Sequence, residues 1–495
     1  MDHRPQLIAY ADRLSGGDLG DLKNLLDGPL VGVFGGVHIL PFFDPIDGAD
    51  AGFDPVDHTR VDRRLGDWAD VQAIGQRVPV MADLIVNHIS ADSPQFADYR
   101  RHGANSRFDG LFLSFDRVFS DGAREADLLA IYRPRPGLPF TAYTLDDGSR
   151  RLLWTTFTPK QLDIDVEHPA GRAYLLEILD TFQQHGIRMI RLDAAGYAVK
   201  KAGGSCFMMP ESFAFIDEIS AEAKVRGMEV LVEIHSYYRR QIEIARRVDR
   251  VYDFALPPLV LHALYRRTGQ YLQHWLDIAP RNCVNVLDTH DGIGVVDIGP
   301  DRADPAGSPG LVPDAELEYL VETIHQRSHN QSRQATGAAA SNLDLYQVNC
   351  SFYDALDRDD RAYLIARAIQ CFAPGVPQIY YQGLLAGEND MALLGRSGVG
   401  RDINRHHYRP DEVVQALQRP VVRDLCRLLR FRSTHPAFAG DFTLLDGAPD
   451  SLHLRWARDE HWAALRVRFT DLSVDIQHSK AGGGNDHYEL YKAVL

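Results

Sequence analysis

Eight short apolar segments alternate with amphipathic helical patterns along most of this chain, and this alternation constrains the fold more than any other feature. The predicted strands are residues 7–10, 36–43, 78–87, 189–193, 229–234, 251–254, 284–288 and 376–381. Helical patterns between them include residues 171–184, 210–225, 237–247 and 359–371. Repeated β/α units favour a parallel sheet, and eight of them match a closed barrel. We therefore predict an α/β fold, a (β/α)8 TIM-type barrel.

The spacing between the predicted strands is uneven in two places, which indicates two inserted small domains. About a hundred residues separate the third strand from the fourth, far more than one helix needs, and a second long gap follows Asp291. Near the C-terminus the pattern changes to short β runs, which suggests an antiparallel domain. The predicted domains are a barrel of residues 1–87, 167–291 and 358–435, an inserted domain of residues 88–166, an inserted loop and helix domain of residues 292–357, and a C-terminal β domain of residues 436–495.

Composition excludes several functional classes. The 495 residues include 53 Lys and Arg against 68 Asp and Glu, a net charge of −15, which gives no electrostatic case for nucleic-acid binding. The five cysteines are widely spaced without a C-x-x-C pair, so we expect neither disulfides nor a zinc site. No apolar run approaches the roughly 18 residues of a membrane span, and the N-terminus lacks a signal-peptide pattern. We expect a soluble, cytoplasmic protein without a membrane partner.

The fourth predicted strand carries Arg191 and Asp193, and strand alternation puts them on the same side. A nearby guanidinium favours the ionised form of a carboxylate, so we expect Asp193 to be charged at neutral pH. Barrel enzymes carry reactive side chains at the carboxyl ends of strands, which makes Asp193 a candidate nucleophile. An ion pair that only fixes a loop would explain the same two residues. This stretch alone does not separate the two interpretations.

Other predicted strands also end in acidic residues with a His close in sequence. These strand-end residues are Asp83, His88, Glu233, His235, His290 and Asp291. A single strand-end Asp can be a helix cap, whereas several such ends together indicate chemistry. The set could bind a divalent metal, or two carboxylates could flank a glycosidic bond. We favour the second, because Arg191 would oppose a metal beside Asp193 and no H-x-H or H-E-x-x-H spacing occurs.

These strand ends resemble the four signature regions of the α-amylase superfamily, in the same chain order. Where most α-amylases follow the nucleophile with Lys-His, this chain has Gly196-Tyr197, which resembles the sucrose phosphorylases of glycoside hydrolase family 13. The same resemblance extends over residues 47–54, 203–210, 233–238, 251–258, 287–294, 337–349 and 400–405. It runs from about residue 10 to residue 432.

The resemblance implies an enzyme that cleaves sucrose with phosphate to α-glucose-1-phosphate and fructose, through a covalent glucosyl-enzyme, with transglucosylation as a side activity. It implies that Asp193 is the nucleophile, Glu233 the general acid and base, and Asp291 the transition-state stabiliser. Retention requires the first two carboxyl groups to lie roughly 5–5.5 Å apart. The implied sugar-binding residues are His88, Arg191 and His290, with Asp50, Arg401, Phe53 and Phe157 around a glucose pocket closed at its far end.

The acceptor phosphate is an anion in an acidic protein, so it needs an arginine or backbone donors. Arg135, in the turn Arg133-Pro134-Arg135, is the candidate, with Arg133 as the alternative because a turn can aim only one of them inward. The other acceptor-side candidates are Tyr197 and Tyr346 for phosphate, and Asp344 and Gln347 for fructose. In the family, the loop around residues 344–347 shifts between fructose-binding and phosphate-binding arrangements, and we hold the same shift here as a hypothesis.

Alternatives with the same triad are phosphorylases of sucrose 6-phosphate, glucosylglycerol or glucosylglycerate, and a sucrose hydrolase. A non-catalytic relative would lose catalytic carboxylates, and this chain keeps all three. We expect no cofactor and no metal. The superfamily's frequent calcium site uses an asparagine at the position of Asn87 together with the region after the nucleophile, where this chain has Gly196-Tyr197; we expect Asn87 to be a structural hydrogen-bonding residue. The resemblance also suggests a homodimer.

Overall fold

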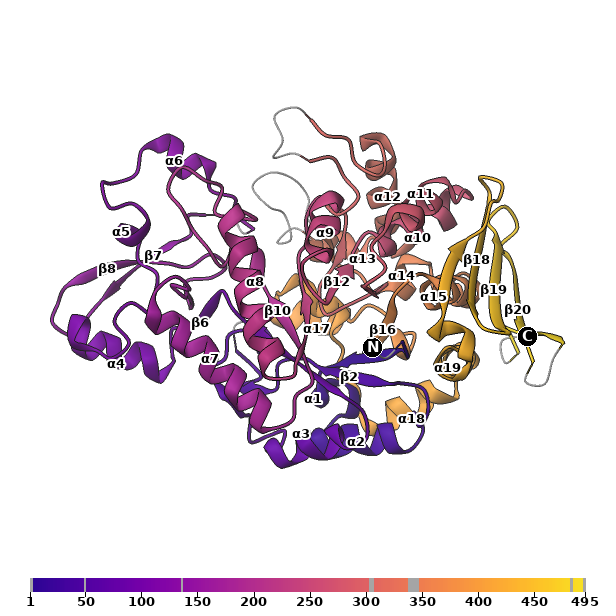
Figure 1. Ribbon diagram of the computed structural model, residues 1–495, viewed down its shortest axis with the longest axis horizontal. Coiled ribbons are helices and arrows are strands. Elements are labelled where there is room, and N and C mark those ends of the chain that lie inside the picture. The colour runs from indigo at the N-terminus through magenta and orange to yellow at the C-terminus, as the bar shows by residue number, and fades with distance from the viewer. Residues whose placement is uncertain are drawn as a thin grey trace.

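The computed structural model describes residues 3–48, 50–134, 137–301, 307–336, 347–480 and 484–492. Eight parallel strands close into a barrel in the order β1, β16, β13, β12, β11, β10, β5 and β2 (Figure 1). Their bounds are β1 Gln6–Ala9, β2 Gly36–Ile39, β5 Val80–Ile85, β10 Met189–Asp193, β11 Glu229–Val232, β12 Arg250–Asp253, β13 Cys283–Asn285 and β16 Val376–Tyr380. The predicted TIM-type barrel is confirmed.

The barrel strands are buried on both faces, which is why they read as apolar runs in the sequence. Outside, α8 packs on β11, α9 on β12 and α15 on β16. Inside, a separate apolar cluster fills the barrel: Met81, Met189, Leu231, Tyr252, Phe254, Val284 and Val286. The helices are α1 Ala11–Ser15, α2 Leu19–Asp27, α3 Trp68–Gly75, α7 Pro169–Gln184, α8 Pro210–Val225, α9 Tyr238–Ala245, α10 Leu256–Arg266, α11 Gln270–Ile278, α14 Phe352–Ala355, α15 Asp360–Phe372, α16 Tyr381–Leu384, α17 Met391–Ser397, α18 Pro410–Gln418 and α19 Pro420–Thr434.

A lobe extends from one end of the barrel between β5 and α7 (Figure 1). It contains β6 His88–Ser90, α4 Pro94–His102, α5 Phe115–Val118, α6 Glu125–Ala130, β7 Phe140–Thr144, β8 Arg150–Trp154 and β9 Gln161–Asp163. The hairpin β7–β8 covers a small core around Trp154, and β6 pairs with β9 where the lobe joins the barrel. These elements fall within the predicted insertion of residues 88–166, whose boundaries stay a prediction.

The second long gap contains β14 Ile293–Gly294, α12 Asp314–Arg327, α13 Gln331–Thr336 and β15 Gln347–Val348. β14 and β15 pair antiparallel, with Gly294 opposite Gln347, so the two ends of this segment meet beside the barrel. Among the described residues, no helix is both long and apolar enough to cross a bilayer.

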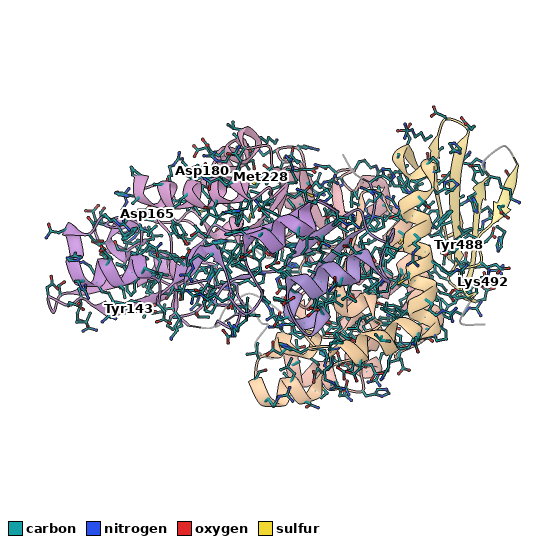
Figure 2. All side chains as sticks on the ribbon, turned by 90° about the horizontal axis from the view of Figure 1, so that it is seen from below. Tyr143, Asp165, Asp180, Met228, Tyr488 and Lys492 are labelled. Atoms are coloured by element: carbon teal, nitrogen blue, oxygen red, sulfur yellow. The ribbon has the colours of Figure 1, made fainter. Side chains whose placement is uncertain are left out.

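The C-terminal domain is an antiparallel sheet of five strands in sequence order. This confirms the predicted antiparallel β structure. Its strands are β17 Asp441–Leu444, β18 Ser451–Arg458, β19 His461–Arg468, β20 Ser473–Ser479 and β21 Asn485–His487. The sequence predicts short β runs at residues 442–445, 452–456 and 462–468, which correspond to β17, β18 and β19. It missed β20 and β21, because their side chains are mostly polar and those of β21 are exposed. Figure 2 labels Tyr143 and Asp165 near the lobe at one end of the molecule and Tyr488 and Lys492 near this sheet at the other.

Candidate active site

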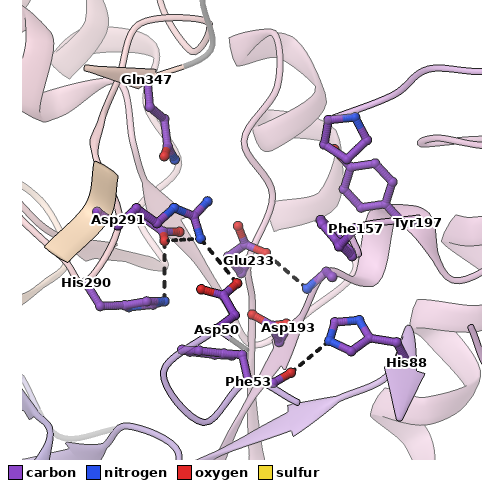
Figure 3. Close-up of a pocket in the computed structure, with 13 residues that line it drawn as sticks. Asp50, Phe53, His88, Phe157, Asp193, Tyr197, Glu233, His290, Asp291 and Gln347 are labelled. Carbon is purple, nitrogen blue, oxygen red and sulfur yellow. Dashed lines mark hydrogen bonds and ion pairs between the residues drawn. The ribbon is translucent and has the colours of Figure 1, made fainter. Parts of the chain in front are cut away.

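A pocket lies where the barrel strands end and the lobe begins (Figure 3). The predicted site residues that line it are Asp50, Phe53, His88, Phe157, Asp193, Tyr197, Glu233, His290, Asp291, Gln347 and Arg401. Pro134 and Ala194 line it as well. Arg191 lies behind Asp193. Three predicted residues, Arg135, Asp344 and Tyr346, and the loop around residues 344–346 lie outside the described residues.

Asp193 ends a chain of buried charges that crosses the barrel. Arg191 Nη1 donates to Asp193 Oδ1 at 2.7 Å and to Asp83 Oδ1 at 2.7 Å. On the far side of Asp83, His38 Nε2 lies 3.0 Å from Asp83 Oδ2. The register explains the contact, because β10 pairs with β5 so that Arg191 lies opposite Asp83. The predicted pair of Arg191 and Asp193 is therefore present, but Arg191 is shared with a second carboxylate.

The electrostatic surroundings of Asp193 differ from the prediction. Burial raises its pKa well above the ordinary value, and the charge of Glu233 acts in the same direction, against Arg191. Arg191 does not overcome burial, since Asp83 competes for its charge; at Asp83, burial also raises the pKa, but His38 and Arg191 outweigh it and lower the pKa to about 2. Contrary to the expectation from the strand, Arg191 alone does not hold the pKa of Asp193 low.

Glu233 lies beside Asp193 because β10 and β11 are neighbouring strands. Its Oε2 accepts a hydrogen bond from the backbone N–H of Ala194 at 3.1 Å (Figure 3). Ala194 adopts a left-handed backbone conformation, with φ of 53°, directly after the candidate nucleophile. Such a conformation is uncommon for a residue with a side chain, and it turns the chain sharply at the point where the two carboxyl groups meet.

Asp291 lies in the opposite electrostatic surroundings. Arg401 Nη1 is 2.9 Å from Asp291 Oδ1, and Arg405 Nη2 is 3.8 Å from the same oxygen. Both arginines also lie 3.7 Å from Asp50. Burial alone would raise the pKa of Asp291, but the charges of Arg401 and Arg405 outweigh it and hold the pKa far below the ordinary value. Arg405, four residues after Arg401 and fully buried, contacts Asp50 and Asp291 and was not assigned by the sequence analysis.

Aromatic rings form the walls of the pocket. Phe53 stacks on His290 with centroids 4.7 Å apart, and its backbone oxygen lies 2.8 Å from Nε2 of His88. Burial lowers the pKa of His290 to about 3, so this ring is neutral at ordinary pH. On the side of the lobe, Phe157 contacts both His88 and Tyr197 edge to face. A flat apolar wall with hydrogen-bonding groups at its edges fits one sugar ring.

Known proteins resemble this chain over nearly its whole length. The family model described as "Alpha amylase, catalytic domain" matches residues 30–251. The chain is 59% identical to the sucrose phosphorylase of Agrobacterium vitis over 97% of its own length and 98% of that protein. It is 52% identical to the sucrose phosphorylase of Bifidobacterium adolescentis, over 94% of this chain and 92% of that one. This chain belongs to the sucrose phosphorylase family.

This family member is therefore an enzyme, a phosphorylase that transfers a glycosyl group. A solved structure agrees with the assignment: the crystal structure of sucrose 6F-phosphate phosphorylase from Thermoanaerobacter thermosaccharolyticum matches with a TM-score of 0.90 at 35% identity. The match covers 99% of this chain and 98% of that one.

Behind the aromatic wall, this sucrose phosphorylase family member carries a buried lysine. Lys200 Nζ lies 2.7 Å from Asn87 Oδ1 and 2.6 Å from Asp163 Oδ2. The hydroxyl and the backbone N–H of Thr156, next to Phe157, also donate to Asp163. Asn87 is thus the structural hydrogen-bonding residue that the sequence predicted. Because an ammonium group already lies between these oxygens, the residues present do not fit the calcium ion that is frequent in the α-amylase superfamily.

Within the described residues, one group offers ligand atoms close enough to share a metal ion. Glu233, His235 and Asp291 each contribute one such atom, all within 4.8 Å of one another. The positive charges of Arg401 and Arg405 beside Asp291 would repel a metal cation there. Both ring nitrogens of His235 already have partners, Asp297 at 2.9 Å and Gln347 at 3.1 Å. The group fits a network of hydrogen bonds better than a metal centre.

Proposed function

We propose that this chain transfers a glucosyl unit from sucrose to inorganic phosphate, releasing fructose and α-glucose-1-phosphate. The observation that carries the proposal is a pocket that combines two neighbouring carboxyl groups, Asp193 and Glu233, with an end bounded by Asp50 and Arg401. Arg405 contacts Asp50 from behind this end. Such an end suits one glucosyl unit and excludes a polymer. The identity with two sucrose phosphorylases supports sucrose as the donor.

In the first half of the proposed reaction, Asp193 attacks the anomeric carbon while Glu233 gives a proton to the departing fructose oxygen. The bond to fructose breaks and an ester forms between glucose and Asp193. The raised pKa of Asp193 supports a pair of carboxyl groups that keeps one proton at neutral pH. In the proposed reaction Glu233 supplies the proton that the leaving oxygen needs, and the hydrogen bond from Arg191 stabilises the negative charge of Asp193 as it attacks.

In the second half, phosphate attacks the same carbon and Glu233 takes the proton from its hydroxyl. Two inversions give retention, and Asp193 leaves as a carboxylate. Asp291 stays ionised beside Arg401, so it is suited to stabilise the positive charge that develops on the sugar in both transition states. Transfer to another hydroxyl in place of phosphate gives the proposed transglucosylation.

We further propose Arg135, Tyr197 and Tyr346 as phosphate-binding residues and Asp344 and Gln347 as fructose-binding residues. For the arginine, the described part of the turn supports the choice. Arg133 Nη1 donates to the backbone oxygen of Gly137 at 3.0 Å, and Pro134, between the two arginines, lines the pocket. Because this hydrogen bond holds the Arg133 side chain within its own turn, Arg133 is less suited than Arg135 to bind an incoming phosphate.

Product analysis on sucrose, with and without inorganic phosphate, tests the function. We expect fructose and α-glucose-1-phosphate, formed at a rate that depends on phosphate. Fructose and free glucose at a rate indifferent to phosphate would make this chain a hydrolase. No turnover of sucrose, with turnover of sucrose 6-phosphate, glucosylglycerol or glucosylglycerate, would replace the donor and keep the mechanism.

Two further predictions have their own tests. We propose that the protein acts in the cytoplasm, which fractionation of the source cells would check. We also propose a homodimer, which light scattering coupled to size-exclusion chromatography would distinguish from a monomer.

A further inference from the structure

A buried carboxylate outside the pocket, Asp297, anchors a chain of hydrogen bonds that leads to the acceptor side. Its Oδ1 accepts from the backbone N–H of Ser236 at 3.1 Å and from Nε2 of Gln241 at 2.7 Å. Its Oδ2 lies 2.9 Å from Nδ1 of His235. Gly294 permits this approach, because a Cβ there would come within 2.2 Å of Asp297 Oδ2. The carboxylate is fully buried and is not among the residues that line the pocket.

His235 connects Asp297 to Gln347, which does line the pocket. The ring is held by stacking on Phe254, with centroids 3.7 Å apart, and its Nε2 lies 3.1 Å from Nε2 of Gln347. Gln347 Oε1 accepts from the backbone N–H of Gly292 at 3.2 Å, which identifies the group that faces the histidine as the NH2 end of the amide.

The donors and acceptors on either side of His235 determine which of its ring nitrogens carries the hydrogen. An amide NH2 only donates, so Nε2 of His235 must accept. A carboxylate only accepts, so Nδ1 must carry the hydrogen toward Asp297. Both ends therefore require the Nδ1–H tautomer. With the hydrogen on Nε2 instead, the Gln347 amide would have to turn round and present NH2 to the N–H of Gly292, which is unfavourable.

We propose that Asp297 is a positioning residue for the acceptor half of the reaction, which it controls by holding His235 in the Nδ1–H tautomer and thereby fixing the orientation of the Gln347 amide. The inference rests on the proposed function, in which phosphate and fructose bind beside Gln347. This series of hydrogen bonds lies next to the catalytic carboxyl groups, because a nitrogen of His235 is within 4.8 Å of oxygens of Glu233 and Asp291. Asp297 itself touches no substrate and acts through two intervening side chains.

Asp297→Asn tests the proposal because it reverses the polarity with almost no change of shape. The asparagine oxygen is expected to stay with the two donors, Ser236 and Gln241, which leaves its NH2 group facing Nδ1 of His235. That nitrogen must then accept, the hydrogen moves to Nε2, and Gln347 has to turn its oxygen toward the ring. A wrong histidine tautomer with intact geometry is known to be severe where an Asp orients a catalytic His.

The experiment uses α-glucosyl fluoride as donor, because fluoride leaves without needing the fructose site. For Asp297→Asn we expect hydrolysis of this donor without phosphate to stay within about twofold of wild type, while kcat/KM for phosphate falls at least about tenfold. Asp301→Asn is the matched control: it removes a carboxylate four residues away whose partner is Arg240, and both rates should stay near wild type. An equal loss of both activities in Asp297→Asn, or an unchanged rate with phosphate, would overturn the proposal.

A second measurement does not depend on the variant folding. In the wild-type protein labelled with ¹⁵N-histidine, the nitrogen shifts of His235, assigned by comparison with His235→Gln, should report hydrogen on Nδ1 and a bare Nε2. Hydrogen on Nε2, either alone or together with Nδ1, would overturn the inference. Failure of the proposed function would look different: wild-type protein would then form no α-glucose-1-phosphate at all, whatever the state of His235.

Discussion

Asp193 and Asp291 meet in one pocket from strand ends of one barrel, yet their surroundings are opposite. Asp193 shares its arginine with Asp83 and lies beside Glu233, so its pKa is raised. Asp291 has two arginines within 4 Å, so its pKa is lowered. The difference teaches that the distribution of cations, and not the residue type, suits one carboxyl to proton sharing and covalent chemistry and the other to permanent negative charge.

The largest expected effect comes from removing the carboxyl group of Asp193. In Asp193→Asn an amide cannot form the glucosyl ester, so fructose release should fall by about 10⁴-fold or more. The fold should persist, because the substitution removes a buried carboxyl whose charge burial disfavours. Steady-state fructose release and a thermal unfolding scan check the two parts. Activity near wild type would remove Asp193 from the role of nucleophile.

The next prediction concerns Asp291. Arg401→Gln removes the nearer of its two arginines and leaves the more distant Arg405. We expect kcat/KM for sucrose to fall by about 10²-fold. Because a cation is lost, the pKa of Asp291 rises, and the acid limb of the pH–activity profile should move toward neutral pH. Arg401→Lys keeps the charge and is the matched control, with a smaller loss. A profile that does not move in Arg401→Gln would contradict the electrostatic role given to this arginine.

Lys200 provides a contrast to both carboxyl groups, because its ion pair with Asp163 lies behind the aromatic wall of the pocket and does not involve Asp193 or Asp291. Lys200→Met leaves Asp163 buried without its cation and should lower the free energy of unfolding by about 3 kcal/mol. The neighbouring Lys201 pairs with Glu167 at the surface, so Lys201→Met should cost less than about 0.5 kcal/mol. Denaturant unfolding of both variants measures the difference. Equal costs would mean that burial does not distinguish the two lysines.

The smallest effect concerns acid stability. The pKa of Asp83 is about 2 in the folded protein, below its ordinary value of 3.8, so its stabilising contribution is present above about pH 4 and is lost as the pH falls toward 2. The shift corresponds to about 2 kcal/mol. Asp83→Asn should therefore flatten the loss of stability between pH 4 and pH 2, although it lowers stability at neutral pH. Urea midpoints across that range would test the slope, and an unchanged slope would exclude Asp83 as its source.

The sequence predicted the barrel and most of the pocket because apolar alternation and strand-end residues are local patterns. The pair of Arg191 and Asp193 follows from alternation within one strand. The contact of Arg191 with Asp83 depends on the register between two strands, and the contact of Lys200 with Asp163 on how the lobe meets the barrel; neither is visible along the chain. The raised pKa of Asp193 was missed for the same reason, because burial depth is a property of the folded molecule.

Trapping the covalent intermediate tests the central claim most directly. In Glu233→Gln, α-glucosyl fluoride can still glucosylate the enzyme, because fluoride needs no acid, whereas release of the glucosyl group lacks its base. Mass spectrometry of the digested protein should find one glucosyl unit on the peptide that contains Asp193. A glucosyl unit on a different residue, or no adduct together with a product of inverted configuration, would contradict the account.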